Sequence, residues 1–319
     1  MALRVHIDGG HTDPVYLRAL REALRATVDL SVGDAPDDLA HVACLVSGWP
    51  DEGLLDAAAG LRSVVIPFAG PPARTLRVLQ GRGLRIFNLH HNASAVAEMA
   101  LALLLACAKC VVPMDSALRQ GDWRPRYGED PGASLAGRRA LVLGYGAIGS
   151  RVGGLLRAFG VTVTGIRRTA RDGCHGVDDL PNLLPAADVL VVALPGTAAT
   201  EGLLGAPEIA ALPRGSIVVN VGRARVIDEG ALYESLRTGH LHSAGLDVWY
   251  RYPREEEDRA STMPSSQPFH ELDNVVLSPH RAGHGAAVEE ERGRQLASLL
   301  NLLASGGEPD TQVNLAEGY

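Results

Sequence analysis

The sequence has few cysteines, no long apolar run and no concentrated stretch of basic residues. The four cysteines, Cys44, Cys107, Cys110 and Cys174, are too few and too scattered for a disulfide framework. No apolar segment approaches the roughly 20 residues that span a bilayer, and the opening residues MALRVHIDGG lack the long apolar core of a secretory signal. We therefore expect a cytoplasmic protein.

Charges of both signs are spread along the chain, with 30 basic and 37 acidic side chains and a formal net charge of −7. Without a dense basic stretch, neither a nucleic-acid groove nor a surface for anionic membranes is indicated. We expect the partners to be small molecules.

Cys107 and Cys110 form a CxxC pair, which elsewhere can hold a metal or carry redox chemistry. Here the pair lies inside AEMALALLLACAK, an apolar helical run, and no second ligand pair accompanies it. This setting favours small thiols buried in a core, and we expect no metal site.

At 319 residues the chain is long enough for two domains. Short β-type runs alternate with helical patterns almost from end to end, which predicts an α/β fold with parallel sheets. In the first segment the predicted strands are LRVHID, VACLVS, SVVIPF and LRIFNL, separated by helices such as PVYLRALREALRA. The second series is RALVLG, VTVTGI, ADVLVVAL, SIVVNV, SAGLDV and NVVLSP, the strand complement of a dinucleotide-binding sheet.

Two long helical segments flank the second series. SAVAEMALALLLACAK is apolar around most of its circumference, so we expect it to be buried between layers or to pack across the two-fold axis of a homodimer. The tail AAVEEERGRQLASLLNLLAS follows the last strand and is expected to return to the first domain. YPREEEDRASTMPSSQP is predicted to be an exposed loop.

A glycine-rich turn joins the first strand of the second series to a helix. RALVLGYGAIGSRVGGLLRAFG places Gly144, Gly146 and Gly149 in the pattern GxGxxG, directly after an apolar strand. Glycines allow the tight turn and let the backbone approach a pyrophosphate, which free N–H groups at the helix N-terminus stabilise. This turn predicts a dinucleotide site.

The next strand, VTVTGIRRT, ends where an acidic residue would bind the ribose hydroxyls of NAD. Arg167 and Arg168 occupy that strand end, followed by Thr169. Guanidinium groups without a carboxylate suit the 2′-phosphate of NADP, so NADP(H) is the expected cofactor, with NAD(H) as the second choice. Two solvated arginines on a surface loop are the alternative.

GYGAIG, VNVGRARVIDEGAL, AGLDVW and NVVLSPHRAG occur in the order and spacing of the D-isomer-specific 2-hydroxyacid dehydrogenases, and the chain resembles that family over essentially its whole length. The resemblance is most specific in residues 94–284. In the first ninety residues VVIPFAGPPAR is similar to the family's substrate loop and NLHHNASAVAEMA to its hinge helix entry. The resemblance to this family implies a doubly wound Rossmann-type nucleotide domain, residues 94–284, inserted into a flavodoxin-like substrate domain, residues 1–93 and 285–319. It also implies that the active site lies between the two domains.

The resemblance assigns roles to two residues of the second domain. Arg223 of GRARVID matches the substrate-binding arginine, and His280 of SPHRAG matches the catalytic acid/base. The physical logic agrees, because a guanidinium grips a carboxylate and polarises the neighbouring carbonyl, while an imidazolium gives a proton to the carbonyl oxygen as hydride reaches carbon. Each follows a predicted strand, and ligands collect at the carboxyl ends of such strands.

Further site residues are carried over by position. Backbone N–H groups near Ala69 and Gly70 are expected to hold the substrate carboxylate, and His91 and Asn92 are expected to contact either the substrate or the hinge. The residues expected at the cofactor, besides the glycines and Arg167 to Thr169, are Tyr145, Ala147, Ile148, Leu194, Pro195, Thr200, Val221, Gly222, Asp247, His280 and Gly283.

The sequence departs from the family at one catalytic position. The family reads DVFxxEP, and its Glu holds the histidine protonated; here DVWYRYP places Tyr252 at that position. Without that carboxylate, protonation of His280 needs another source of support. Tyr252 can hydrogen-bond the imidazole, a carboxylate among Glu255 to Glu257 can approach, or the substrate can carry extra negative charge.

The leading hypothesis is therefore an NADPH-dependent reductase of a 2-oxoacid, with Arg223, His280 and Tyr252 as catalytic residues. Arg251, Arg254, Arg281, His91 and His284 are candidate donors for a second anionic group on the substrate, such as the phosphonate of phosphonopyruvate. Two alternatives stay open: a dehydrogenase of an inorganic oxyanion such as phosphite, and a dinucleotide-sensing protein that binds without strong catalysis.

Overall fold

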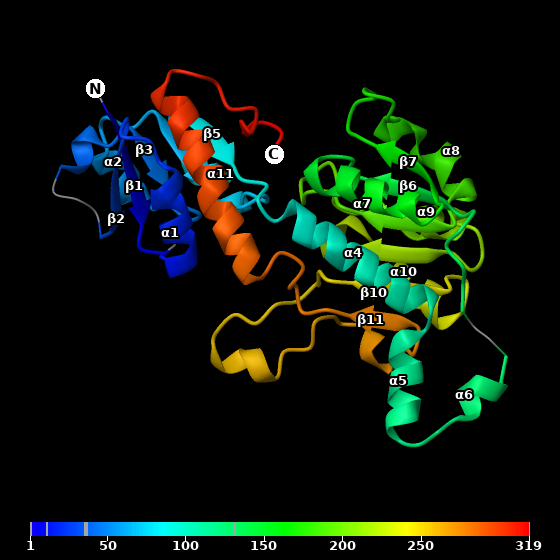
Figure 1. Cartoon of the computed structure of the whole chain (residues 1–319). Coiled ribbons are helices and arrows are strands. Elements are labelled where there is room, and N and C mark those ends of the chain that lie inside the picture. Colours follow the sequence, from blue (N-terminus) through cyan, green and yellow to red (C-terminus); the bar gives the residue numbers. More distant parts are fainter. Residues whose placement is uncertain (1, 11, 35–37, 130–131, 319) are drawn as a thin grey trace. The chain divides into compact units, whose positions relative to one another are not determined.

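The computed structural model describes residues 2–10, 12–34, 38–129 and 132–318, and the chain divides into two compact units (Figure 1). Unit 1 consists of Met1–Asn92 and His284–Tyr319, and unit 2 of Ala93–Gly283. The boundaries expected from the sequence lie one residue later at each of the two crossings. Each unit is a parallel sheet with helices on both faces, which confirms the predicted α/β class.

Unit 1 contains a five-stranded sheet in the order β2-β1-β3-β4-β5, the flavodoxin arrangement. All its strand pairs are parallel. The strands are β1 (Leu3–Asp8), β2 (Val28–Gly33), β3 (Cys44–Val46), β4 (Ser63–Ile66) and β5 (Arg85–Asn88). Strand β2 was missed by the sequence analysis; it is an edge strand in which Val28, Leu30 and Val32 alternate with polar residues.

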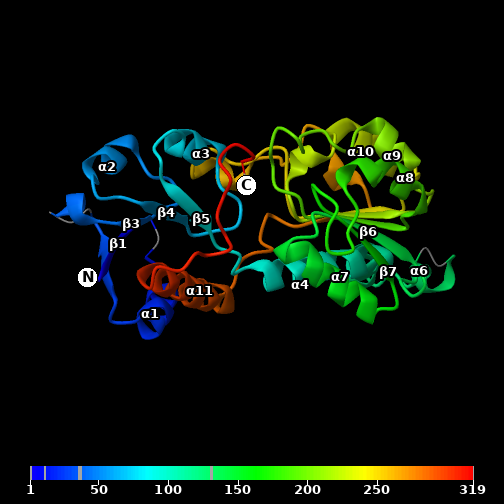
Figure 2. The same ribbon diagram turned by 90° about the horizontal axis from the view of Figure 1, so that it is seen from above.

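Helices cover both faces of the unit 1 sheet (Figure 2). One face carries α1 (Pro14–Ala23) and α11 (Ala286–Ala304), and the other carries α2 (Glu52–Ala57) and α3 (Ala73–Leu79). Helix α11 crosses α1 so closely that a Cβ on Gly293 would lie 2.5 Å from the carbonyl oxygen of Tyr16. The last helix of the chain thus belongs to the core of unit 1, together with the first.

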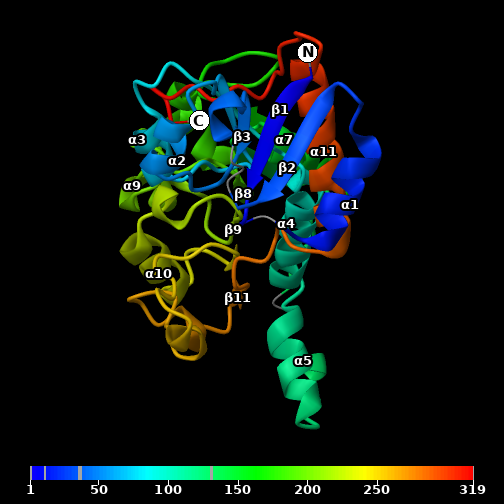
Figure 3. The same cartoon turned by 90° about the vertical axis from the view of Figure 1, so that its left-hand side faces the viewer.

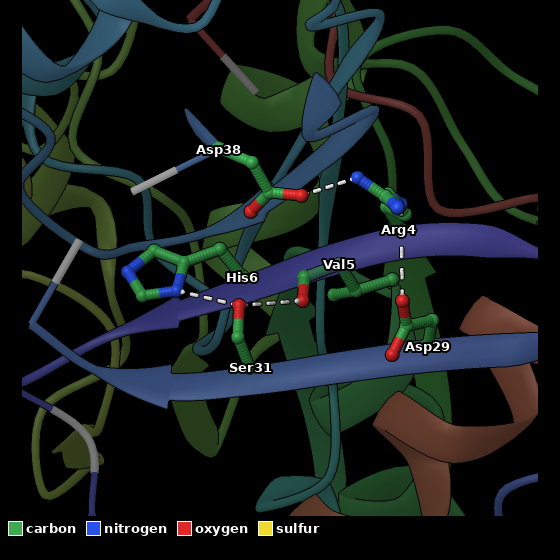
Figure 4. Close-up of polar contacts among 6 residues, drawn as sticks. All are labelled: Arg4, Val5, His6, Asp29, Ser31 and Asp38. Atoms are coloured by element: carbon green, nitrogen blue, oxygen red, sulfur yellow. Dashed lines mark hydrogen bonds and ion pairs between the residues drawn. The ribbon is translucent and has the colours of Figure 1, made fainter. Parts of the chain in front are cut away.

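Polar side chains link β1 to β2 at the edge of this sheet (Figure 4). The Nδ1 atom of His6 lies 3.0 Å from the Ser31 hydroxyl, which donates to the carbonyl of Val5 at 3.3 Å. Because the hydroxyl proton goes to Val5, we assign the proton of this pair to His6 Nδ1. Arg4 pairs with Asp29 at 3.8 Å and also with Asp38. Burial lowers the pKa of His6, so the imidazole that contacts Ser31 is neutral.

Unit 2 contains a six-stranded parallel sheet in the order β11-β10-β9-β8-β6-β7. Beyond β7, His175 forms a single parallel bridge with Ile166. Counting that bridge as a minimal third strand gives the order of a dinucleotide-binding sheet. The six strands match those predicted: β6 (Arg139–Leu143), β7 (Thr162–Ile166), β8 (Val189–Val192), β9 (Ile217–Asn220), β10 (Ser243–Leu246) and β11 (Val275–Leu277).

Helices α4 (Ala93–Ala108) and α7 (Ala147–Ala158) cover one face of the unit 2 sheet (Figure 2). The other face carries α8 (Leu180–Leu183), α9 (Ala206–Ala211) and α10 (Glu229–Arg237). Helix α4 packs so tightly on β10 that a Cβ on Gly245 would lie 2.7 Å from the Cβ of Leu103. Cys107 is buried there, and burial raises the pKa of its thiol to about 12, so it is a core thiol.

Helix α5 (Val111–Arg119) extends away from the sheet of unit 2 (Figures 1 and 3), and α6 (Arg124–Tyr127) follows it in the chain (Figure 1). This arm exposes the apolar or aromatic side chains of Val111, Val112, Leu118, Trp123 and Tyr127. In the described part of the chain no single helix has the length and apolarity to cross a membrane; α4 and α5, bent by 64°, meet the criteria only as a pair. The same part holds no cluster of three ligating side chains suited to a metal ion.

Candidate active site

The glycine turn follows β6 and begins α7. Gly144 has a φ of 91°, and a Cβ there would lie 2.7 Å from the carbonyl oxygen of Ala193. A Cβ on Gly149 would lie 2.2 Å from the carbonyl oxygen of Gly144. These two glycines are therefore required by the turn and by the contact between strand and helix.

Gly146 differs from its two neighbours in the motif. A Cβ at this position would meet nothing within 4 Å, so packing within the protein does not explain the glycine. Gly146 is also the N-cap of α7 and has no side-chain cap, which leaves the first N–H groups of a twelve-residue helix for a ligand. Space and donors together fit a pyrophosphate.

The end of β7 carries more positive than negative charge. Arg167 is partly buried, and its Nη1 lies 3.9 Å from Asp172, which lies equally far from Arg171. The Nε of Arg167 is buried without a hydrogen-bond partner among the described residues. Arg168 and Thr169 are exposed next to it. The unpartnered Nε of Arg167, on a guanidinium whose ion pair is as long as 3.9 Å, is available to an anion.

The loop after β8 is held in its conformation by the hydroxyl group of Thr200. Thr200 donates to the carbonyl of Pro195 at 2.6 Å and accepts from the N–H of Thr197 at 2.9 Å. The Thr200 proton is thus used inside the loop. The backbone of Leu194 runs against Gly222, where a Cβ would lie 2.7 Å from the Leu194 carbonyl oxygen. Val221 donates its N–H to the carbonyl of Val192 at 3.0 Å, so the predicted cofactor residues at the ends of β8 and β9 form one packed edge.

Arg223 follows β9 and is held in place by its neighbours. Its Nη1 donates to the carbonyl of Gly222 at 2.8 Å, and its side chain packs on Gly196, where a Cβ would lie 3.2 Å from Cγ of the arginine. Buried Asn220 closes the turn, because its amide donates to the carbonyl of Arg223 at 3.1 Å and its oxygen accepts from Gly222 N–H at 3.1 Å. The guanidinium is therefore anchored at the carboxyl end of β9.

Asp247, at the end of β10, organises the loop that carries His280. The carboxylate is 1% exposed. Its Oδ1 accepts from the Ser278 hydroxyl at 2.5 Å and from Arg281 N–H at 2.9 Å, and its Oδ2 accepts from Ala282 N–H at 3.1 Å. Both oxygens are thus engaged with the loop on either side of His280. The predicted role of Asp247 at the cofactor stays a prediction.

His280 has a left-handed backbone, with a φ of 55°, a conformation that costs energy for a residue with a Cβ. Its imidazole Nδ1 lies 2.9 Å from the hydroxyl oxygen of Tyr252. That oxygen also accepts from the N–H of Trp249 at 3.1 Å. The indole of Trp249 donates to the carbonyl of Ser278 at 2.7 Å, so Tyr252 and Trp249 brace the histidine loop from one side.

Of the three supports expected for His280, the hydrogen bond with the hydroxyl of Tyr252 is therefore present in the structure. Burial raises the pKa of Tyr252, while the Trp249 N–H and the nearby charge of Arg223 act in the opposite direction. The phenol accordingly stays protonated at neutral pH, and its influence on His280 comes from a neutral hydroxyl. Glu256, from the expected carboxylate group, instead pairs with Arg259 at 2.9 Å.

Unit 1 contains the predicted substrate loop. The side-chain amide of buried Asn88 donates to the carbonyl of Ala69 at 2.7 Å, and the N–H of Asn88 bonds the carbonyl of Thr311 at 3.1 Å. Asn88 thereby ties the segment containing Ala69 and Gly70 to the end of β5. Whether their N–H groups bind substrate stays a prediction.

His91 is buried in unit 1. Arg292 Nε donates to its Nε2 at 3.1 Å, and its Nδ1 has no partner among the described residues. Burial, followed by the charge of Arg292, lowers the pKa of His91 to about 3, so this imidazole is neutral. The side-chain oxygen of Asn92 is likewise buried without a partner in the described ranges. Both residues stay candidates for a ligand or hinge contact.

Several residues that build the site were not singled out from the sequence: Asn88, Asn220, Trp249 and Ser278. Each is polar or aromatic, lies at or just beyond a strand end, and uses its side chain to bond a backbone carbonyl, a backbone N–H or the buried Asp247. A polar residue that directly follows an apolar strand is the signal that could have found three of them.

The fold and the site define a dinucleotide-binding protein with an arginine, a histidine and a tyrosine gathered at one sheet edge. The family model for the D-isomer specific 2-hydroxyacid dehydrogenase NAD binding domain matches residues 101–282. The chain therefore belongs to the D-isomer specific 2-hydroxyacid dehydrogenase family, and the resemblance inferred from the motifs is confirmed.

Individual relatives agree with this assignment. The chain is 35% identical over 230 residues to a glyoxylate reductase of Aeropyrum pernix, covering 69% of this chain and 66% of that protein. It is 31% identical over 242 residues to a D-3-phosphoglycerate dehydrogenase of Methanocaldococcus jannaschii, covering 73% of this chain and 44% of the relative. The chain spans about half the length of the D-3-phosphoglycerate dehydrogenases that it matches.

Among solved structures, a D-isomer specific 2-hydroxyacid dehydrogenase from Xanthobacter autotrophicus Py2, in complex with NADPH and MES, superposes with a TM-score of 0.81. The two chains are 27% identical, and the match covers 99% of each. The two-unit architecture of this chain is thus found along the whole of a family member.

Proposed function

We propose that this protein reduces a 2-oxoacid to a 2-hydroxyacid, with NADPH as the hydride donor. The observation that carries the proposal is the arrangement of Arg223, Tyr252 and His280 at the carboxyl edge of the unit 2 sheet. Tyr252 bonds His280 directly, and although burial raises the pKa of Tyr252, the charge of Arg223 is close enough to act on the same hydroxyl. An anchored guanidinium beside an oriented imidazole is what reduction of a carbonyl next to a carboxylate requires.

In this mechanism the nicotinamide, when bound, supplies the hydride. Arg223 binds the substrate carboxylate and polarises the neighbouring carbonyl. Because Tyr252 engages Nδ1 of His280, we assign Nε2 as the atom that donates the proton to the carbonyl oxygen. The hydroxyl of Tyr252 can accept from a protonated imidazole or donate to a neutral one, so it orients the ring in both charge states.

NADP(H) is the proposed cofactor, with NAD(H) as a weaker substitute. The open space at Gly146 and the uncapped start of α7 fit the pyrophosphate. The guanidinium group of Arg167, whose buried Nε has no hydrogen-bond partner among the described residues, fits a 2′-phosphate, and Arg168 is the next residue at the same strand end. The NADPH complex of the Xanthobacter relative supports the same choice.

The substrate we propose carries a second anionic group, with a phosphonate such as that of phosphonopyruvate as one example. The tyrosine at position 252 is neutral, so additional negative charge that favours the protonated histidine has to come from elsewhere. The name of the Methanocaldococcus relative, a D-3-phosphoglycerate dehydrogenase, gives a phosphorylated compound as substrate, which supports a doubly anionic molecule here.

We further propose that the protein acts as a cytoplasmic homodimer, and we assign the contact to the arm formed by α5 and α6. The apolar side chains of α4 already fill the core of unit 2, whereas the arm exposes Trp123 and Tyr127 at 59% and 80%. A second copy would cover these side chains through the same surface on both subunits.

The function is tested by the loss of nicotinamide absorbance when NADPH is mixed with a panel of 2-oxoacids. His280→Ala should lower kcat by about 10²–10⁴ while NADPH binding is retained. Arg223→Ala should raise KM and lower kcat together, because one group binds substrate and polarises the carbonyl. Arg237→Ala, an exposed change on α10, is the matched control and should leave both constants unchanged.

Other outcomes would redirect the proposal. Activity with phosphite and NADP, but not with any 2-oxoacid, would favour the oxyanion dehydrogenase. Tight NADPH binding without turnover of any compound would favour the dinucleotide-sensing protein. A near-normal rate for His280→Ala would remove the histidine from the mechanism.

A further inference from the structure

A cavity of about 570 Å³ opens in unit 2 beside the catalytic residues, and no role has yet been given to it. It lies between the segment that follows Arg223 and the loop after β10. Its walls include three arginines, two tyrosines and a glutamate: Arg225, Arg251, Arg254, Tyr250, Tyr252 and Glu229. Asp258 completes the charged lining, which therefore holds three positive and two negative side chains.

One of the two negative charges of this cavity, that of Glu229, is engaged in strong hydrogen bonds with residues outside the lining. Glu229 accepts from the Ser265 hydroxyl at 2.5 Å and from Ser266 N–H at 2.7 Å. Burial opposes ionisation of Glu229, but these hydrogen bonds outweigh it and lower the pKa of the carboxyl group. The ionised carboxylate is thus bound to Ser265 and Ser266, which do not line the cavity. Asp258 accepts a long contact of 3.4 Å from the N–H of Glu255.

The positive charges are less engaged. Arg225 has a long ion pair of 3.7 Å with exposed Glu201, the kind of surface pair that contributes little. Arg251 and Arg254 have no ion pair within the described ranges of the chain. The neighbouring Arg259, by contrast, pairs with Glu256 at 2.9 Å. The cavity therefore presents guanidinium donors that a bound anion would satisfy.

One side chain belongs both to this cavity and to the catalytic arrangement. Tyr252 lines the cavity, and its hydroxyl lies 2.9 Å from Nδ1 of His280. A group bound against Arg251 and Arg254 is therefore separated from the imidazole by the side chain of Tyr252. The reacting carbonyl is assigned to Nε2, the other nitrogen of the ring, so a substrate can reach both places only if its chain passes Tyr252 and its second anionic group is several bonds away from the carbonyl.

We infer that this cavity is a subsite for the distal anionic group, a carboxylate, phosphonate or phosphate, of an extended 2-oxoacid. The inference rests on the proposed function, because it assumes that the carbonyl end of the molecule binds Arg223 and His280. It narrows the substrate class to doubly anionic 2-oxoacids in which a flexible chain separates the two ends. Arg251 and Arg254, with Arg225, then determine specificity for the distal group.

The kinetic test compares 2-oxoacids of equal length with and without a terminal carboxylate. The pairs are oxaloacetate with 2-oxobutyrate, 2-oxoglutarate with 2-oxopentanoate, and 2-oxoadipate with 2-oxohexanoate. For each pair the ratio of kcat/KM, doubly to singly charged, is measured with saturating NADPH. We expect this preference to grow with chain length, and a preference that is absent or falls with length would overturn the inference.

Matched variants locate the preference. In the double variant, Arg251→Gln with Arg254→Gln, the ratio of kcat/KM for the best pair of substrates should fall about tenfold. This is the size expected for charged hydrogen bonds that are weakened by exposure to solvent. Arg237→Gln, at the last residue of α10 and outside the cavity lining, removes an arginine that is paired with Glu234 at 2.7 Å, and should keep the wild-type ratio. Equal ratios in the wild type and the double variant would overturn the inference.

A binding measurement separates failure of the subsite from failure of the proposed function. Calorimetric titration with glutarate, which has two carboxylates and no carbonyl, does not depend on turnover. Binding that is weakened in the double variant but not in Arg237→Gln supports the cavity as an anion site even if no 2-oxoacid is reduced. A second titration, with inorganic phosphate, tests whether the cavity binds a free anion instead. If phosphate binds in a way that depends on Arg251 and Arg254, and glutarate does not bind, the substrate assignment is overturned.

Discussion

Replacing Tyr252 by Phe removes one oxygen that makes two hydrogen bonds, at 2.9 Å to Nδ1 of His280 and at 3.1 Å from the N–H of Trp249. A hydrogen bond of this kind contributes about 1 kcal/mol net, and more when one partner is charged. Tyr252 is 47% exposed, so water can replace part of the loss. We therefore expect kcat/KM to fall about fivefold to tenfold, which corresponds to a loss of about 1 kcal/mol or slightly more in transition-state stabilisation.

The assay is NADPH oxidation by the best 2-oxoacid, measured as kcat/KM from pH 5 to 9. Tyr252→Phe should reduce the plateau, because the imidazole loses the group that orients it. Tyr252→Glu provides the opposite perturbation, since a carboxylate stabilises the imidazolium and raises the pKa of His280. The histidine must be protonated to donate, so the alkaline limb of the profile should move to higher pH.

The two variants also bear on the charge of the substrate. With a doubly anionic 2-oxoacid, a carboxylate at position 252 should repel the distal group and weaken binding, whereas a singly charged 2-oxoacid should bind normally. If Tyr252→Phe has wild-type rates and a wild-type pH profile, the tyrosine only fills the space of the usual glutamate, and the reasoning is refuted.

Two further predictions concern the cofactor and the stability of unit 1. Changing Arg167 to Asp and Arg168 to Ser should move the cofactor preference toward NAD by roughly 1–3 kcal/mol, read from kcat/KM with NADPH and NADH; equal use of both by the wild type would contradict the assignment. His91 has a folded pKa of about 3, below that of an unfolded histidine, so the unfolded chain binds its proton first and stability should fall as the pH drops from about 6.5, by up to roughly 1.4 kcal/mol per pH unit. His91→Asn should flatten this loss in urea unfolding of unit 1 between pH 6 and pH 4, whereas exposed His175→Asn should not; an unchanged slope for His91→Asn would assign the loss to other groups.

Most strands could be predicted because they are short apolar runs bounded by turn residues. The exception, β2, lies at the sheet edge, and its burial is partial along most of its length. Its residues Val28, Leu30 and Val32 do alternate with polar ones, but the pairing with β1 that makes them a strand is a tertiary event. Edge strands carry the weakest sequence signal because only one side of their backbone is paired.

The residues of the proposed catalytic site could be named from the sequence, but the contacts between them could not. Arg223 and His280 could be named because GRARVID and SPHRAG resemble motifs of the family, and the position of each residue after an apolar strand of one sheet agrees with that resemblance. Which group supports His280 could not be decided, since the tyrosine, the nearby glutamates and the substrate were all compatible with the spacing. The answer depends on a loop path set by the N–H of Trp249 and by the buried carboxylate of Asp247, and neither contact has a local sequence pattern.

The construction of unit 1 from two segments on either side of unit 2 determines the order in which the two units can be completed during synthesis. The sheet of unit 1 is completed early, yet one of its faces is covered by Leu296, Leu300 and Leu303 of α11. Unit 2 is continuous and can close while the ribosome is still making α11. Until residues 286–304 emerge, the apolar face under α11 stays open to solvent and to other nascent chains, so the first segment of unit 1, although made before unit 2, is protected from aggregation only after it.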